Sequence, residues 1–104
     1  MSGPTVFTPA LTPKQKAKLK GLANGISQRY LLGKSEPDEG FLVTVDKALE
    51  AKELIKVGLL QSCLSTPKEV AALLEAKLRC QTVQIIGRVV VLYRRSQKNP
   101  RIEP

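Results

Sequence analysis

The last part of the chain carries the feature that most constrains the fold, a pair of strand-like segments joined by a very short connection. Residues 81–86 and 89–95 are rich in valine and isoleucine, and only Gly87 and Arg88 separate them. Valine and isoleucine favour strands, and a two-residue connection is typical of an antiparallel hairpin. The chain is therefore expected to build a sheet that contains at least one antiparallel pair.

Three amphipathic segments are predicted to form helices, and two of them begin in the same way. Residues 12–15 (TPKQ) and 66–69 (TPKE) each supply a capping threonine, a proline at the first helical position and a Gln or Glu that completes a capping box. The first of these helices is expected to end near Gly25. The remaining helix, which lies between these two in the chain, is expected to run from Pro37 or Glu39 to Lys52. Acids in its first turn complement the helix dipole.

Two further β-rich stretches, residues 28–32 and 54–60, alternate with these helices. The expected order along the chain is therefore α-β-α-β-α-β-β, in which helices between successive strands imply crossover connections. The predicted fold class is α/β, a single-domain two-layer sandwich with a mixed four-stranded sheet. Residues 1–10 are expected to form a flexible arm and residues 96–104 a loose tail.

The residue types that the chain lacks exclude several classes of active site. Without histidine, neither a Ser-His-Asp nor a Cys-His catalytic unit can form. Cys63 and Cys80 cannot complete a tetrahedral zinc shell and do not form a CxxC motif, so we expect two buried free thiols. We expect no catalytic residue, no metal and no cofactor. No segment approaches the ~20 apolar residues of a membrane span, and no secretory signal is recognisable, so a cytoplasmic protein is expected.

The formal charge of +8 is concentrated at the two ends of the chain. Residues 1–35 carry a net charge of +6, residues 36–75 a net charge of −4, and residues 76–104 a net charge of +6. If the two ends meet in the fold, they form a cationic surface suited to a polyanion. The alternative interpretation is that the protein is merely basic and soluble.

Four stretches taken together resemble a known family: LTPKQKAKLKGLA at 11–23, GK at 33–34, ELIKV at 53–57 and QIIGRVVVLYR at 84–94. They resemble the CRM domain (chloroplast RNA splicing and ribosome maturation), also called the YhbY-like RNA-binding domain, over residues 11–95. The resemblance implies a fold similar to the C-terminal domain of translation initiation factor three, preceded by an extra helix. It also implies RNA as the partner, because single-domain bacterial members are associated with the precursor of the large ribosomal subunit.

The resemblance further implies where RNA would be bound. The family carries a GxxG loop that clamps nucleic-acid backbone, and here the four positions read GKSE, with Glu36 in place of the second glycine. Either Lys34 and the backbone of Gly33 and Ser35 still contact RNA, or the role of the loop has weakened. The predicted RNA-binding residues are Lys14, Lys18, Lys20, Arg29, Gly33, Lys34, Ser35, Lys56, Arg88 and Arg94.

Some of these positions have a simpler interpretation. The lysines of residues 14–20 flank the apolar stripe of their helix, so they can equally form a solvated face. Lys56 can simply lie on an exposed sheet face. We expect Gly87 to serve the hairpin turn, and Leu92 and Tyr93 to pack in the core rather than stack on bases.

With only four aromatic residues in the chain, sequential base stacking is not the expected binding mode. The favoured function is a non-catalytic, monomeric RNA-binding protein that recognises phosphates and shape, acting on large-subunit ribosomal RNA during ribosome assembly. The alternative is a protein–protein adaptor on ribosome precursors that uses the acidic segment 36–53. An enzyme is the least favoured class, because the carboxylates form no recognisable motif and the chain has no GxxxxGK loop.

Overall fold

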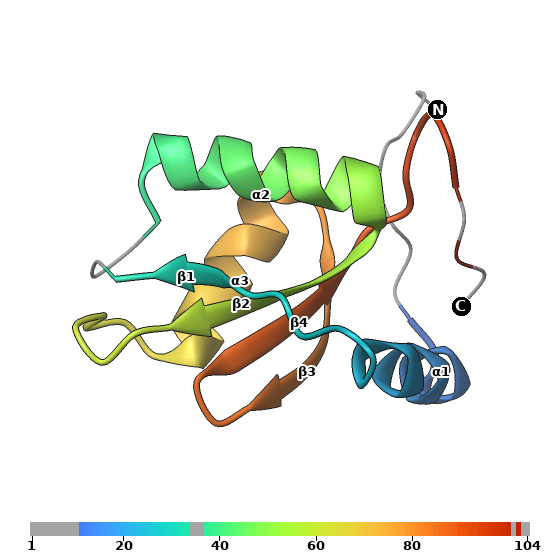
Figure 1. The fold of residues 1–104 in the computed structure, drawn as a ribbon, viewed down its shortest axis with the longest axis horizontal. Helices are drawn as coiled ribbons and strands as arrows, with labels where there is room; N and C mark the ends of the chain where they lie inside the picture. The colour runs from blue at the N-terminus through green and yellow to red at the C-terminus, as the bar shows by residue number, and fades with distance from the viewer. Residues whose placement is uncertain (1–10, 34–36, 101, 103–104) are drawn as a thin grey trace.

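The four strands form one mixed sheet in the order β1-β2-β4-β3 (Figure 1). The computed structural model describes residues 11–33, 37–100 and 102. Its elements are α1 (Pro13–Ala23), β1 (Tyr30–Leu32), α2 (Glu39–Lys52), β2 (Leu54–Leu59), α3 (Pro67–Leu78), β3 (Gln81–Ile86) and β4 (Val89–Tyr93). Strand β1 is parallel to β2, whereas β4 is antiparallel to both β2 and β3. The predicted element order, the mixed sheet and the terminal hairpin are therefore confirmed.

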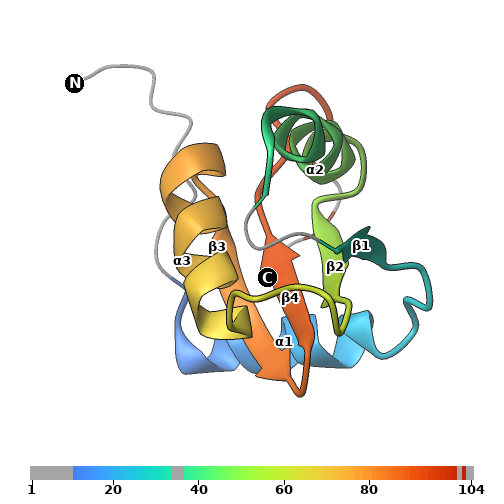
Figure 2. The ribbon, with the colours of Figure 1, turned by 90° about the vertical axis from the view of Figure 1, so that its left-hand side faces the viewer.

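The helices lie on both faces of this sheet, so the domain has three layers and not the two that we expected from the sequence. Helices α2 and α3 pack on one face, and α1 packs alone on the opposite face (Figure 2). Period-two alternation along the strands sends Ile55 and Leu92 into the α2–α3 cluster, and Leu54 and Tyr93 into the α1 cluster. Leu92 and Tyr93 are both buried, which confirms that they belong to the core.

The helix starts follow the predicted capping signals. In α1, Thr12 Oγ1 accepts a hydrogen bond from the backbone N–H of Gln15 at 3.1 Å, and Gln15 Oε1 accepts one from the N–H of Thr12 at 2.9 Å. Thr66 and Glu69 repeat this capping box at the start of α3, with the same two distances. Each such cap is worth about 1 kcal/mol, so local sequence fixes where these two helices begin.

Gly87 adopts a φ of +57° between β3 and β4, a left-handed conformation that favours glycine. A side chain at this position would strain the turn, although it would find open space around it. This confirms that Gly87 serves the geometry of the hairpin.

Both cysteines are free and buried, as expected. Burial, together with the negative charge of Glu75, raises the pKa of the Cys80 thiol to about 12. This thiol therefore stays protonated at neutral pH and packs as a small apolar side chain. Within the described ranges, no three His, Cys, Asp or Glu side chains gather closely enough to hold a metal ion, and no helix is both long and apolar enough to span a membrane.

Two carboxylates at the end of α2 hold the segment that follows β4. Glu53 is fully buried, and its side chain accepts hydrogen bonds from the backbone N–H groups of Ser96 and Ile102, both at 2.8 Å. The Glu50 carboxylate accepts from the Ser96 hydroxyl at 2.6 Å and from the backbone N–H groups of Gln97 and Lys98 at 3.1 Å. The segment predicted as a loose tail is thus attached to α2 at several points, and the predicted arm, residues 1–10, lies outside the described residues.

Candidate nucleic-acid interface

The sheet face that carries α1 is covered over only part of its length. Helix α1 packs against the end of the sheet where Leu54 pairs with Tyr93. Toward the other end, the strand pairing places four residues in one row across all four strands: Leu31, Gly58, Val89 and Ile86. Leu31 and Ile86, at the two edges of this row, are 58% and 53% exposed. This end of the sheet face is therefore accessible to a partner at its two edges, while Gly58 in the middle of the row is buried.

Two predicted RNA-binding residues lie on this side of the sheet. Lys56 is half-buried and follows the alternation of Leu54 and Gly58, so it points to the same side. Arg29 is exposed, and its aliphatic stem crosses Gly58: a Cβ there would lie 3.5 Å from Arg29 Cδ and 3.2 Å from Leu31 Cδ2. Glycine at position 58 thus lets a cationic and an apolar side chain lie close to the sheet.

The lysines of α1 extend this cationic region. Lys14, Lys18 and Lys20 are all exposed, whereas Leu19 and Ala23 anchor the helix on the sheet. We call the set Lys14, Lys18, Lys20, Arg29 and Lys56 the α1 face, because all five belong to the side of the sheet that α1 occupies. The structure thus brings together residues that are up to 42 positions apart in the sequence.

Gly33 lies at the other end of the molecule, in the loop after β1. Its carbonyl accepts a hydrogen bond from Ser62 Oγ at 2.9 Å, and a Cβ at this position would lie 3.2 Å from Leu60 Cδ1. Close packing against the β2–α3 loop is therefore a structural reason for a glycine here. Lys34 and Ser35, the other predicted contacts of this loop, lie outside the described residues.

Arg88 lies at the hairpin turn and is exposed, but its guanidinium is hydrogen-bonded within the protein. Its Nε donates to the carbonyl of Leu59 at 3.1 Å, and its Nη2 donates to the carbonyls of Leu60 and Cys63 at 2.8 and 3.2 Å. Arg88 therefore ties the β3–β4 turn to the β2–α3 loop. This architectural role accounts for an arginine at this position without RNA.

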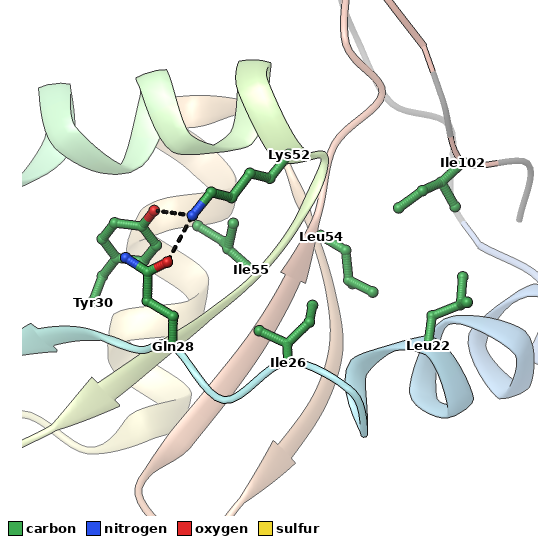
Figure 3. Close-up of a pocket in the computed structure, with 8 residues that line it drawn as sticks. All are labelled: Leu22, Ile26, Gln28, Tyr30, Lys52, Leu54, Ile55 and Ile102. Carbon is green, nitrogen blue, oxygen red and sulfur yellow. Dashed lines mark hydrogen bonds between the residues drawn. The ribbon is translucent and has the colours of Figure 1, made fainter.

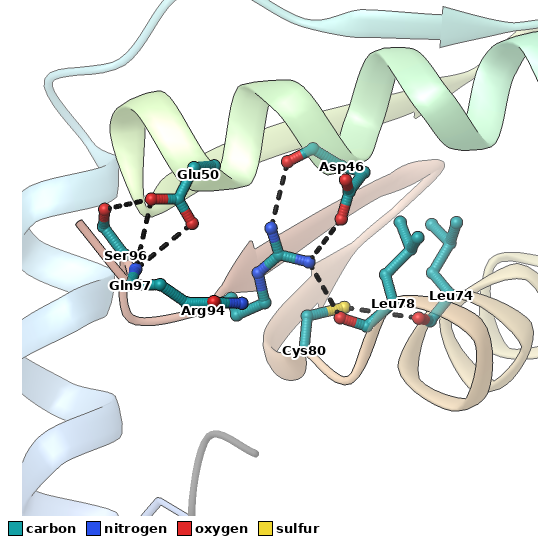
Figure 4. Close-up of polar contacts among 8 residues, drawn as sticks. All are labelled: Asp46, Glu50, Leu74, Leu78, Cys80, Arg94, Ser96 and Gln97. Atoms are coloured by element: carbon teal, nitrogen blue, oxygen red, sulfur yellow. Dashed lines mark hydrogen bonds and ion pairs between the residues drawn. The ribbon is translucent and has the colours of Figure 1, made fainter. Parts of the chain in front are cut away.

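Arg94 does not belong to the candidate interface. It follows Tyr93 and so points to the opposite side of the sheet, where its Nη1 forms a 2.7 Å ion pair with Asp46 Oδ1 (Figure 4). The same guanidinium donates to the carbonyls of Leu78 and Asp46, both at 3.0 Å. With its side chain only 8% exposed, Arg94 joins α2 to α3 and is not placed to meet a phosphate.

Four acids of the segment between residues 36 and 53 are also engaged within the protein. Asp38 Oδ1 caps α2 by accepting from the N–H of Phe41 at 2.8 Å, and Asp46 pairs with Arg94. Glu50 and Glu53 hold the segment after β4, as Figure 4 shows for Glu50. Most of this acidic segment is therefore used to build the fold rather than to present a surface.

A polar cluster that sequence reasoning missed lies beside the start of β1. Lys52 Nζ, in the last turn of α2, donates to Gln28 Oε1 at 2.7 Å and to the Tyr30 hydroxyl at 3.2 Å (Figure 3). Gln28 and Tyr30 are two positions apart in an extended stretch, so their common side was readable from the sequence. Their contact with Lys52 could not be predicted from the sequence. Together these three residues form one end of a pocket of about 330 Å³.

A family model described as the CRS1 / YhbY (CRM) domain matches residues 11–94. This range contains α1, the whole sheet and every member of the α1 face. The chain belongs to the CRS1/YhbY (CRM) domain family. The predicted family is therefore confirmed.

Relatives of this CRM protein include proteins named for RNA binding. The chain is 40% identical over 93 residues to "Probable RNA-binding protein YqeI" of Bacillus subtilis (strain 168), covering 89% of this chain and 97% of that protein. It is 35% identical over 88 residues to an "RNA-binding protein" of Haemophilus influenzae, covering 85% and 89% of the two chains. The solution structure of the hypothetical protein SAV1595 from Staphylococcus aureus has the same fold, with a TM-score of 0.75 and 40% identity, over 90% of this chain and 98% of that one.

Proposed function

We propose that this CRM protein is a non-catalytic RNA-binding protein that acts on large-subunit ribosomal RNA during ribosome assembly. The observation that carries the proposal is the α1 face, which gathers Lys14, Lys18, Lys20, Arg29 and Lys56 on the partly open side of the sheet. Such a surface suits the regularly spaced phosphates of a nucleic acid. The names of the relatives support RNA as the polyanion.

The binding mode follows from which side chains are exposed. Tyr30 and Phe41 are half-buried and Tyr93 is buried, so the aromatic residues that the structure describes form no stacking platform. The exposed groups of the α1 face are ammonium and guanidinium groups. Affinity therefore comes mainly from phosphate contacts, and selectivity from the shape of structured RNA.

A protein–protein adaptor that works through residues 36–53 is less well supported. Asp46 is paired with Arg94, and Glu50 and Glu53 hold backbone N–H groups of the segment after β4. A basic partner protein would have to compete with these internal contacts. We propose that the protein acts in the cytoplasm as a monomer, with the α1 face turned toward RNA.

Filter binding of the purified chain to a large-subunit ribosomal RNA fragment, over a series of salt concentrations, tests the binding mode. We expect the logarithm of the affinity to fall linearly with the logarithm of salt, with a slope that corresponds to roughly four to seven neutralised phosphates. Transfer RNA serves as the comparison ligand. A flat salt response would contradict electrostatic recognition.

Crosslinking in cells, followed by sequencing of the attached RNA, tests the biological target. We expect reads to concentrate in large-subunit ribosomal RNA and to include precursor sequences. Reads spread mainly over messenger RNA would contradict the ribosomal assignment while leaving RNA binding itself intact.

A further inference from the structure

A pocket between the α1–β1 connection and the C-terminal end of α2 is not used by the proposed phosphate contacts. Its volume of about 330 Å³ lies within the range of pockets that hold small organic ligands. Five aliphatic side chains form most of its lining, as Figure 3 shows: Leu22, Ile26, Leu54, Ile55 and Ile102. Leu22 is 45% exposed, so the pocket has a rim that reaches solvent. These walls suit the faces of a flat apolar ring.

The other end of this pocket is polar and already ordered. Lys52 Nζ bridges Gln28 Oε1 at 2.7 Å and the Tyr30 hydroxyl at 3.2 Å, and it lies 5.6 Å from the centre of the Tyr30 ring. An ammonium group has three N–H donors, and these two bonds use two of them. The Gln28 side chain adds the two N–H donors of its amide. A ligand with acceptor atoms along one edge of an aromatic ring would match this arrangement.

Nucleobases have this combination of apolar faces and a polar edge. Proteins that recognise RNA sequence usually read single bases in loops and bulges, through hydrogen bonds to the base edge. Amide side chains are well suited to this because they present a donor and an acceptor side by side. The pocket therefore has the chemistry of a base-reading site, in a chain that lacks an exposed stacking surface among its described residues.

The pocket also lies next to the α1 face. Arg29 directly follows Gln28, so its backbone lies beside the pocket while its side chain crosses Gly58 on the α1 face. A nucleotide whose phosphate contacts Arg29 would thus have the pocket close to its base. A cation on the α1 face that binds the phosphate, together with a neighbouring apolar pocket whose edge carries an amide, forms a consistent site for one nucleotide.

We propose that this pocket receives one unstacked nucleobase of the RNA that the α1 face binds. The proposal rests on the proposed function and adds a source of sequence preference to it. The α1 face supplies most of the affinity, and Gln28 and Lys52 select the base edge. A free mononucleotide has the same chemistry, so the experiment must separate a base within RNA from a free one.

Two variants remove the pocket in different ways. Leu22→Trp fills it from the exposed rim, and Gln28→Met keeps the size of the side chain while removing its hydrogen-bonding groups. Val43→Trp is the matched control, because Val43 is 48% exposed on α2 and does not line the pocket. Thermal unfolding followed by circular dichroism establishes that each variant is folded.

The probes are RNA hairpins that share one stem and carry loops of A, C or U, with affinities measured by fluorescence anisotropy at several salt concentrations. We expect the wild-type protein to prefer one loop by roughly tenfold, the size of a typical single-base contribution. Both pocket variants should reduce this preference to about twofold or less without changing the salt slope, since no phosphate contact is lost. Val43→Trp should behave like the wild-type protein.

The remaining outcomes separate the two proposals. The base pocket would be overturned if binding depended on salt but showed no loop preference. It would also be overturned if Leu22→Trp and Gln28→Met both left the preference intact. Neither outcome would contradict RNA binding itself. Failure of the wild-type protein to bind any hairpin or ribosomal RNA fragment at low salt would overturn the proposed function itself. A third outcome concerns adenosine, cytidine or uridine monophosphate. If one of these shifts the NMR signals of Ile26 and Gln28 and the preferred hairpin does not displace it, the pocket binds a free nucleotide, which would contradict our proposal.

Discussion

The acidic segment 36–53 and the α1 face carry charges of opposite sign, and these charges have different roles in the structure. Asp46, Glu50 and Glu53 make ion pairs and hydrogen bonds to parts of the chain more than 40 positions away. The side chains of Lys14, Lys20 and Arg29 are instead exposed on one side of the sheet. One region uses its charge to join elements together, and the other presents its charge to solvent.

This difference shows that the net charge of a segment does not by itself identify an interaction surface. In the sequence, the block of −4 between two blocks of +6 looks like a second, anionic surface. In the structure, Asp46 neutralises Arg94, and the carboxylates of Glu50 and Glu53 are satisfied by backbone N–H groups. The acidic segment therefore presents less free negative charge than the sequence pattern indicates.

The largest expected effect comes from reversing the charge of α1. We expect the triple variant Lys14→Glu, Lys18→Glu and Lys20→Glu to lose about 100-fold in affinity for large-subunit ribosomal RNA, because phosphate attraction is replaced by repulsion. The matched control changes exposed lysines on α2 and α3 by the same total charge: Lys47→Glu, Lys68→Glu and Lys77→Glu. Filter binding at one salt concentration compares them. Equal losses would mean that net charge, and not the α1 face, determines binding.

Removing the internal ion pair should affect stability instead. We expect Arg94→Met to lower the free energy of unfolding by about 2 kcal/mol, somewhat less than for a fully buried pair, because Asp46 is half exposed. Urea denaturation measures this change. The RNA affinity of the folded variant should equal that of the wild-type protein. A variant that keeps its stability and loses RNA affinity would place Arg94 back in the interface.

A single cation of the α1 face should have a smaller and more specific effect. We expect Lys56→Met to weaken RNA binding about fivefold and to reduce the salt slope by about one, since one phosphate contact is lost while the packed stem is kept. Affinity measured over a salt series gives both values. An unchanged slope would show that Lys56 merely covers the sheet.

The smallest expected effect concerns Glu50. Hydrogen bonds from the Ser96 hydroxyl and from the backbone N–H groups of Gln97 and Lys98 hold the pKa of Glu50 below its ordinary value of 4.5. A carboxylate with a lowered folded-state pKa stabilises the protein above its unfolded-state pKa, and this stabilisation is lost as the pH falls through the folded-state value. The wild-type protein should therefore be slightly more stable than Glu50→Gln near neutral pH, and the difference should shrink below about pH 4.5. Urea denaturation at neutral and acidic pH tests this, and a difference that grows in acid would contradict it.

The elements of the fold were largely predictable because their signals are local. The capping boxes at Thr12 and Thr66 and the glycine turn at Gly87 each act over a few residues, and all are found as expected. The end of the last strand was less predictable. Strand β4 ends at Tyr93 rather than at the expected residue 95, although the Arg94 N–H still donates to the carbonyl of Glu53 in line with the β2–β4 pairing.

The candidate site was predictable only in part. Lys14, Lys18, Lys20, Arg29 and Lys56 were all named from charge and family resemblance, and the structure places them on one side of the sheet. Arg94 carries the same charge as these residues but faces the other way, because side chains alternate along β4. The cluster of Gln28, Tyr30 and Lys52 had no combined signal in the sequence.

The sequence by itself thus determined the helices, the strands, the excess of positive charge and the family. The tertiary structure decided which charges face solvent and which are paired, because the partners of Arg94, Glu50 and Glu53 are brought close only when α2, α3 and the end of β4 pack together. It also decided that a pocket lies beside the cationic face. Capping and turn formation depend on neighbours in the chain, whereas burial, pairing and cavities depend on segments that meet only in the folded protein.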